Sequence, residues 1–85
     1  MVKPYIDKFL GGCVERTFIS TEGLVWHKDK EDRKVILLKG KCSFILDNNI
    51  PINMIIGKEY FIPKEVWHKI IFVEEGSVIR ILRDF

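Results

Sequence analysis

The stretch CSFILDNNIPINMII, residues 42–56, joins two short apolar runs through Asp47-Asn48-Asn49. Aspartate and asparagine tolerate the left-handed backbone angles that tight turns between antiparallel strands require. The stretch therefore predicts a β-hairpin with strands over 42–46 and 50–56. Pro51 has no backbone N–H to donate, so we expect it at a sheet edge or at the start of a strand.

Similar runs rich in valine, isoleucine and phenylalanine recur at close intervals along the chain. The turn Glu74-Glu75-Gly76-Ser77 joins one such run at 69–73 to another at 78–82, and Gly40 and Gly57 bound further runs. Short β-prone runs separated by turn residues are typical of an antiparallel barrel or sandwich. We predict an all-β protein with almost no helix.

The composition is that of an ordinary folded protein, with 85 residues, 47% of them hydrophobic and 31% charged. This length suffices for one domain only, so we expect residues 1–85 to form a single domain. The formal net charge of +2 is too small to predict a nucleic-acid or membrane surface. The first residues lack the long apolar run of a signal peptide, so we expect a cytoplasmic protein.

Two segments, Val35–Leu38 and Ile70–Val73, are apolar on both of their faces, although the wall of an isolated barrel should alternate apolar and polar side chains. A second copy of the chain is the simplest cover for such an outer face. We therefore predict a homodimer, and sedimentation that shows only monomer at micromolar concentration would contradict it.

The cysteines and tryptophans have plain structural interpretations. Cys13 and Cys42 lack the close spacing of a zinc or redox motif, so we expect both to be small core residues. Trp26 and Trp67 are expected to pack on the outer face of the barrel.

The two histidines of the chain occur in the same tripeptide, Trp26-His27-Lys28 and Trp67-His68-Lys69, each in a predicted strand or at its end. Side chains alternate between the two faces of a strand. If His27 points into the barrel, Asp29 points inward again. By the same alternation, His68 shares its face with Ile70 and Phe72.

The interior would then hold His27, Asp29 and His68. Two imidazole nitrogens and one carboxylate oxygen bind one side of an octahedral divalent ion and leave positions open for a substrate. These three residues are therefore the candidate metal ligands.

The spacing around both histidines resembles that of the cupin superfamily. Its first motif has a glycine, two histidines one residue apart, a glutamate and a closing glycine, and the corresponding positions here are Thr21, His27, Asp29, Arg33 and Gly40. Its second motif has a glycine, a proline, a glycine, a histidine and an asparagine, which correspond to Gly57, Pro63, Glu65, His68 and Phe72. The resemblance covers residues 21–82 and implies a double-stranded β-helix, or jelly-roll, barrel.

The resemblance also implies one divalent ion, of iron, manganese, nickel or zinc, but two of the four usual ligand positions differ. Asp29 replaces a histidine and is itself able to bind a metal, whereas Arg33 replaces the glutamate and is not. A guanidinium about 4 Å from a divalent ion would cost about 8 kcal/mol at an effective dielectric near 20.

Arg33 therefore has two alternatives. It either turns outward and leaves His27, Asp29 and His68 to bind a metal, or points inward and pairs with Asp29 where a metal would otherwise sit. Of the two, we favour the inward arginine.

Three functions follow from these alternatives. The first is a metal-dependent enzyme that uses His27, Asp29 and His68. The second is a metal-free module in which Arg33 and the two histidines bind a small carboxylate or phosphate. The third is a structural or interaction barrel without chemistry. A fold does not choose among them.

Overall fold

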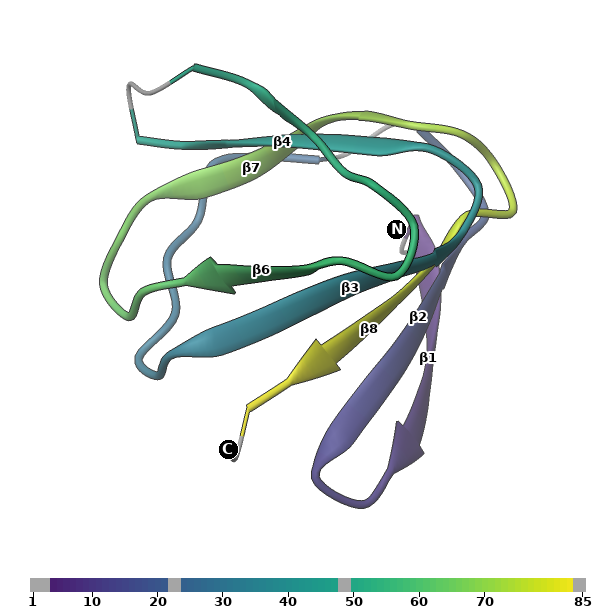
Figure 1. The fold of residues 1–85 in the computed structure, drawn as a ribbon, viewed down its shortest axis with the longest axis horizontal. Coiled ribbons are helices and arrows are strands. Elements are labelled where there is room, and N and C mark those ends of the chain that lie inside the picture. The colour runs from purple at the N-terminus through teal and green to yellow at the C-terminus, as the bar shows by residue number, and fades with distance from the viewer. Residues whose placement is uncertain (1–3, 22–23, 48–49, 84–85) are drawn as a thin grey trace.

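The computed structural model describes residues 4–21, 24–47 and 50–83 (Figure 1). This part of the chain contains strands and no helix, which confirms the all-β prediction. It consequently holds no helix of the length and apolarity needed to cross a bilayer. The strands are β1 (Tyr5–Leu10), β2 (Cys13–Phe18), β3 (Arg33–Lys39), β4 (Cys42–Leu46), β5 (Ile52–Asn53), β6 (Glu59–Ile62), β7 (His68–Val73) and β8 (Val78–Leu82).

The strands form two antiparallel sheets that face each other across the core (Figure 1). The larger has the order β1-β2-β8-β3-β6, and the smaller has the order β5-β4-β7. The predicted turn at 74–77 is confirmed, and it carries the chain from the smaller sheet to the larger one. Gly76, with a φ of 85°, donates its N–H to Phe18 O within this turn, which ties the turn to the end of β2.

The predicted hairpin is confirmed, but its second strand is shorter than expected. Ser43 pairs with Asn53 and Phe44 with Ile52, and only 52–53 form a strand. The chain leaves the sheet because Ile56 bridges Leu37 of the opposite sheet. Asp47 has the left-handed angle expected of the turn, with a φ of 49°, while Asn48 and Asn49 lie outside the described residues.

The core lies between the inner faces of the two sheets. Cys42 is 3% exposed within it, as predicted, and burial raises the pKa of its thiol to about 11. The same prediction is wrong for Cys13, which is half-buried and lies outside the core. The buried core residues are Val14, Phe18, Val35, Leu37, Cys42, Phe44, Ile62, Val73, Ile79 and Ile81.

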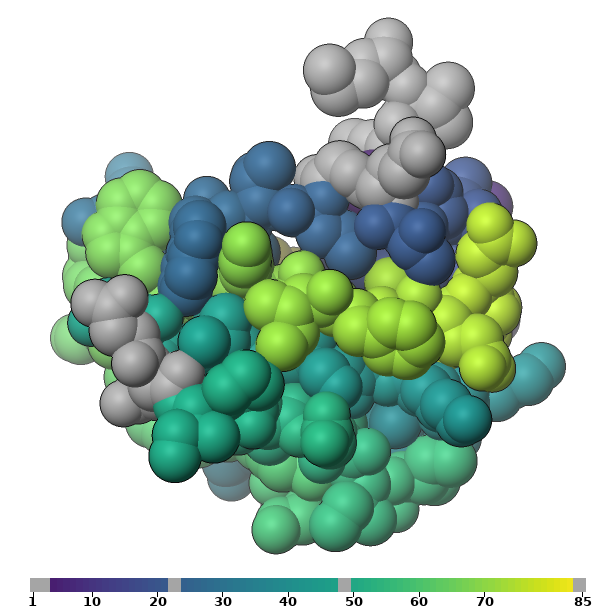
Figure 2. Space-filling model, turned by 90° about the horizontal axis from the view of Figure 1, so that it is seen from above, coloured from purple at the N-terminus to yellow at the C-terminus, as the bar shows by residue number. Residues whose placement is uncertain are grey.

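A β-bulge in β7 changes which side chains face the core. Ser43 pairs with Phe72 but Phe44 pairs with Ile70, so Ile71 is an extra residue that reverses the alternation. Phe72 is therefore 52% exposed, and Val73 is 1% exposed. The prediction that Phe72 shares the inner face of His68 is wrong for this reason. Figure 2 shows the outer face that β7 crosses; the homodimer that would cover it stays a prediction.

Gly40, which directly follows β3, is closely packed against the turn that precedes β8. Its φ is +89°, and a Cβ atom there would lie 2.1 Å from Ser77 Oγ. The Ser77 hydroxyl is fully buried, donates to Lys41 O at 3.1 Å and accepts from Lys41 N–H at 3.0 Å. This contact between two turns requires a glycine.

We expect Gly40→Ala to destabilise the fold more than Gly57→Ala. Gly57 has a similar φ of +86° but has nothing within 4 Å of a built Cβ. Its alanine variant should lose about 1–2 kcal/mol of stability, solely because alanine is strained in the left-handed conformation. Gly40→Ala should lose about 1–3 kcal/mol more through overpacking against Ser77. Urea unfolding of both variants measures the difference, and equal midpoints would contradict it.

The two thiols should react at very different rates in the native protein. Thiolates are the reactive form, and both burial and the raised pKa suppress the thiolate of Cys42. We expect iodoacetamide near pH 8 to modify Cys13 first and to reach Cys42 only in denaturant. Mass spectrometry of timed samples checks this order, and equal rates without denaturant would refute it.

Candidate metal centre

The two histidine tripeptides form one antiparallel pair. The repeat extends to the preceding residue, so the paired segments are Val25-Trp26-His27-Lys28 and Val66-Trp67-His68-Lys69. His27 N–H donates to His68 O at 2.9 Å, and His68 N–H donates to His27 O at 2.8 Å. Directly opposite residues in such a pair project to the same face. The two rings accordingly lie with their centroids 4.2 Å apart and line one cavity.

The tryptophans and lysines of the repeat pair across the same bridge. Lys69 Nζ lies 5.3 Å from the ring centroid of Trp26, and Lys28 Nζ lies 5.4 Å from that of Trp67. Both tryptophans are partly exposed, at 39% and 48%, as predicted for the outer face. Each contact contributes about 0.5–1 kcal/mol at an exposed site, so together they support the bridge from outside.

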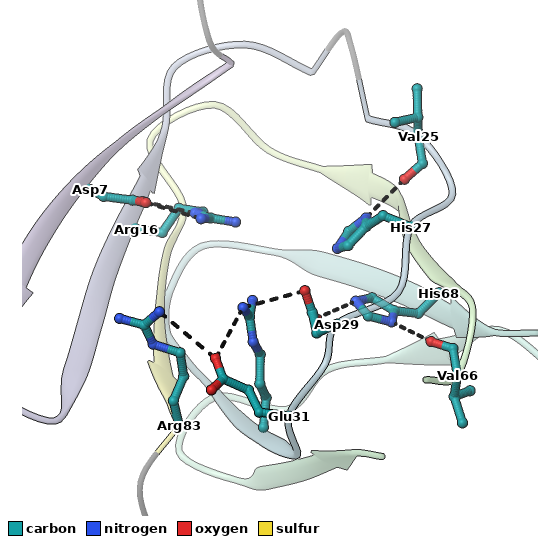
Figure 3. Close-up of polar contacts among 10 residues, drawn as sticks. Asp7, Arg16, Val25, His27, Asp29, Glu31, Val66, His68 and Arg83 are labelled. Atoms are coloured by element: carbon teal, nitrogen blue, oxygen red, sulfur yellow. Dashed lines mark hydrogen bonds and ion pairs between the residues drawn. The ribbon is translucent and has the colours of Figure 1, made fainter. Parts of the chain in front are cut away.

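Each imidazole is oriented by its own backbone. Nδ1 of His27 lies 3.1 Å from Val25 O, and Nδ1 of His68 lies 2.9 Å from Val66 O (Figure 3). A carbonyl oxygen only accepts, so Nδ1 carries the proton in both hydrogen bonds. In the neutral ring, Nε2 then keeps its lone pair. The repeat therefore presents two Nε2 lone pairs as ligands.

Asp29 completes the cluster. Its Oδ2 lies 3.3 Å from His68 Nε2, and the ligand atoms of His27, Asp29 and His68 all lie within 4.8 Å of one another. Within the part of the chain that the structure describes, Asp29 Oδ2 is buried and has no hydrogen-bond partner. Burial lowers the pKa of His68, which keeps its ring neutral. Two lone pairs thus face each other without a shared proton, and a divalent ion would satisfy both.

Arg33 connects Asp29 to Glu31 and Arg83 through a series of ion pairs. Its Nη2 lies 3.3 Å from Asp29 Oδ1 and 3.6 Å from Glu31 Oε1, and Arg83 Nη1 lies 3.9 Å from the same Glu31 oxygen. Arg33 therefore points inward, the alternative that the sequence favoured. The ion pair uses Asp29 Oδ1 and leaves Oδ2 on the side of His68, so an inward Arg33 does not take the place of a metal ion.

The loop that carries Asp29 is fixed to the segment before β7. Glu65 N–H donates to Asp29 O at 2.7 Å, and Lys64 N–H donates to Asp32 Oδ1 at 2.8 Å. Glu65 has a φ of 60°. This left-handed backbone is one that glycine adopts without strain, and glycine is the residue that the resembling motif has at this position.

Two neighbouring cavities meet at this cluster. The inner one, between the sheets, has a volume of about 60 Å³, and the outer one, beside β1 and β2, has about 430 Å³. Both are lined by Arg16, His27, Asp29 and Arg33. The four predicted ligand-binding residues, His27, Asp29, Arg33 and His68, therefore all border the inner cavity.

Arg16 is the cavity residue that sequence reasoning missed. In β2, the side chains of Val14, Arg16 and Phe18 share one face by strand alternation, and Val14 and Phe18 are 5% and 1% exposed. An arginine between two core residues on the inner face of a strand was the available signal.

No family model and no curated protein matches the sequence. Solved structures do match. A cupin-2 domain protein from Shewanella frigidimarina has a TM-score of 0.70 at 22% identity and covers 99% of this chain and 85% of its own. An RmlC-like cupin from Desulfovibrio desulfuricans has a TM-score of 0.67 at 17% identity, with 98% and 89% covered. A structure described as FeII HppE has a TM-score of 0.63 at 10% identity, with 85% and 40% covered.

The matches agree with the all-β fold of two facing sheets. At these identities they establish the fold. Evidence for a metal site comes from the residues themselves, because His27, Asp29 and His68 form a cluster that could hold a metal ion. The chain is therefore a small protein with the cupin fold.

Proposed function

We propose that this protein binds one divalent transition-metal ion through His27 Nε2, His68 Nε2 and Asp29 Oδ2, and binds a small molecule beside it. The observation that carries the proposal is the buried Asp29 Oδ2, which faces His68 Nε2 at 3.3 Å without a hydrogen bond. An unsatisfied buried carboxylate oxygen is costly, and a metal ion removes the cost.

The three donor atoms limit which metal ions are suitable. Two imidazoles and one carboxylate on one side of an ion suit iron(II) and leave positions open for other ligands, while manganese, nickel and zinc accept the same donors. The structural match to a protein described with iron(II) supports iron among the four. Bound metal would supply Lewis acidity at this cavity.

The residues of the chain supply the remaining features of such a site. The Nδ1–H bonds to Val25 O and Val66 O fix the ring orientation of both histidines, which is the usual role of a contact behind a metal ligand. Arg33 holds Asp29 through Oδ1. Glu31, which also contacts Arg33, offsets part of the positive charge near the ion.

The test is metal titration of purified protein by calorimetry, with iron(II) under anaerobic conditions, manganese, nickel and zinc in parallel. We expect one equivalent to bind. Asp29→Asn should weaken binding by at least about tenfold to hundredfold, the loss that is usual even for contacts behind the ligands. Absence of stoichiometric binding of all four ions would refute the proposal.

A matched control comes from the same loop. Asp32→Asn removes an equal charge and keeps the Oδ1 acceptor that holds Lys64 N–H, so it should bind metal like the parent protein. Equal losses in Asp29→Asn and Asp32→Asn would mean that charge near the loop, and not ligation, controls the affinity.

A second candidate function is a metal-free site for a small anion, and the inward Arg33 favours it. In that case phosphate or a carboxylate would bind the Arg33 guanidinium. At a ligand concentration of about a hundred times Kd, binding would stabilise the folded protein by about 2.7 kcal/mol and so raise its melting temperature. Thermal-shift measurements on chelator-treated protein test this. A response that Arg33→Gln abolishes supports the anion site, and no response to any anion rules it out.

A further inference from the structure

The outer cavity, beside the edge strand β1, has a chemistry of its own. Its lining combines apolar side chains, Phe18, Leu24, Val25 and Ile70, with Arg16 and the cluster residues His27, Asp29 and Arg33. Its volume of about 430 Å³ lies within the range of small-molecule sites. A ligand that fills it would contact both apolar carbon and charged groups, among them Arg16.

Arg16 is held rigidly at the wall of this cavity. Its Nε donates to Asp7 Oδ1 at 2.8 Å and its Nη2 donates to Asp7 Oδ2 at 3.0 Å. Its Cζ also lies 3.7 Å from the ring centroid of Tyr5. Tyr5 and Asp7 are alternate residues of β1, so one strand supplies both contacts from one face.

This arrangement leaves part of the guanidinium for a ligand. The two bonds to Asp7 use Nε and Nη2 and do not use Nη1. Figure 3 shows Arg16 reaching from Asp7 toward the side of the cavity on which His27 lies. A planar guanidinium that is already fixed loses little entropy when it binds an anion.

We propose that Arg16 binds the carboxylate of a small amphiphilic acid, whose short apolar body lies against Leu24, Val25 and Ile70. A carboxylate matches the one edge of the planar guanidinium that the bonds to Asp7 leave, because two parallel N–H donors bind two carboxylate oxygens. The placement of this acid beside the metal rests on the proposed function; its recognition by Arg16 does not. Arg16 is thus the residue that determines the charge of the ligand.

The test compares 3-methylbutanoate with its neutral amide, which has nearly the same shape. NMR titration follows binding to the protein with and without one equivalent of zinc, and reports the Nε–H signal of Arg16. We expect millimolar acid to bind and to shift that signal, while the amide binds at least about tenfold more weakly. Equal binding of acid and amide, or binding of neither, would overturn the proposal.

Variants distinguish a specific contact with Arg16 from a general effect of positive charge on acid binding. Arg16→Gln should weaken acid binding by about tenfold to hundredfold and leave the affinity for zinc unchanged. Arg80→Gln is the matched control, because Arg80 pairs with Glu15 at 3.2 Å and lines neither cavity at the cluster. An equal loss in both variants would refute a specific contact.

The two proposals fail separately. Zinc that does not bind, together with acid binding that still depends on Arg16, would refute the metal site and retain the acid site. Zinc that binds, together with acid binding that does not depend on Arg16, would do the reverse. Arg16→Lys, which keeps the charge but not the planar fork, should lose most of the acid affinity, and it covers the case in which Arg16→Gln does not fold.

Discussion

The structure of the site depends on one backbone interaction, the pair of hydrogen bonds between His27 and His68. These two bonds, at 2.9 and 2.8 Å, join two copies of the same tetrapeptide that lie 41 residues apart in sequence and belong to different parts of the fold. Because directly opposite residues project to one face, the bridge alone places both imidazoles in the cavity. The same geometry places each tryptophan beside the lysine of the other copy on the outer face.

Each copy of the tetrapeptide also orients its own ring. The carbonyl two residues earlier binds Nδ1, so neither ring needs a separate partner to expose Nε2. The site then requires one more residue, a carboxylate close to the two Nε2 atoms. Asp29 reaches it because the backbone of Glu65, left-handed like a glycine, donates to Asp29 O. The loop before β3 and the loop before β7 are in this way fixed to each other at the cluster.

Much of this could be predicted from the sequence, and the failures have local causes. Turn residues between short apolar runs predicted the all-β class. Alternation predicted that His27, Asp29 and His68 meet at one cavity, and they do, but His27 is exposed and lies outside the strands. Alternation failed at Phe72, because the bulge at Ile71 adds a residue that no pattern of apolar residues reveals. It was not applied to β2, where it would have placed Arg16 on the inner face between Val14 and Phe18. The predicted second strand of the hairpin was too long. The chain leaves that strand so that Ile56 pairs with Leu37 of the other sheet, and a local sequence pattern does not reveal such a distant contact.

The position of Arg33 shows why charge alone could not decide between metal and anion. From the sequence, a guanidinium and a divalent ion exclude each other, since their repulsion at short range amounts to about 8 kcal/mol. The structure adds two acidic groups to that comparison. Asp29 presents Oδ1 to Arg33 and Oδ2 to His68, and Glu31 lies within 3.6 Å of Arg33 on its other side. The two carboxylates offset the charge of Arg33, and Asp29 keeps Oδ2 on the side of His68, so an inward arginine is compatible with the metal ion proposed at Oδ2.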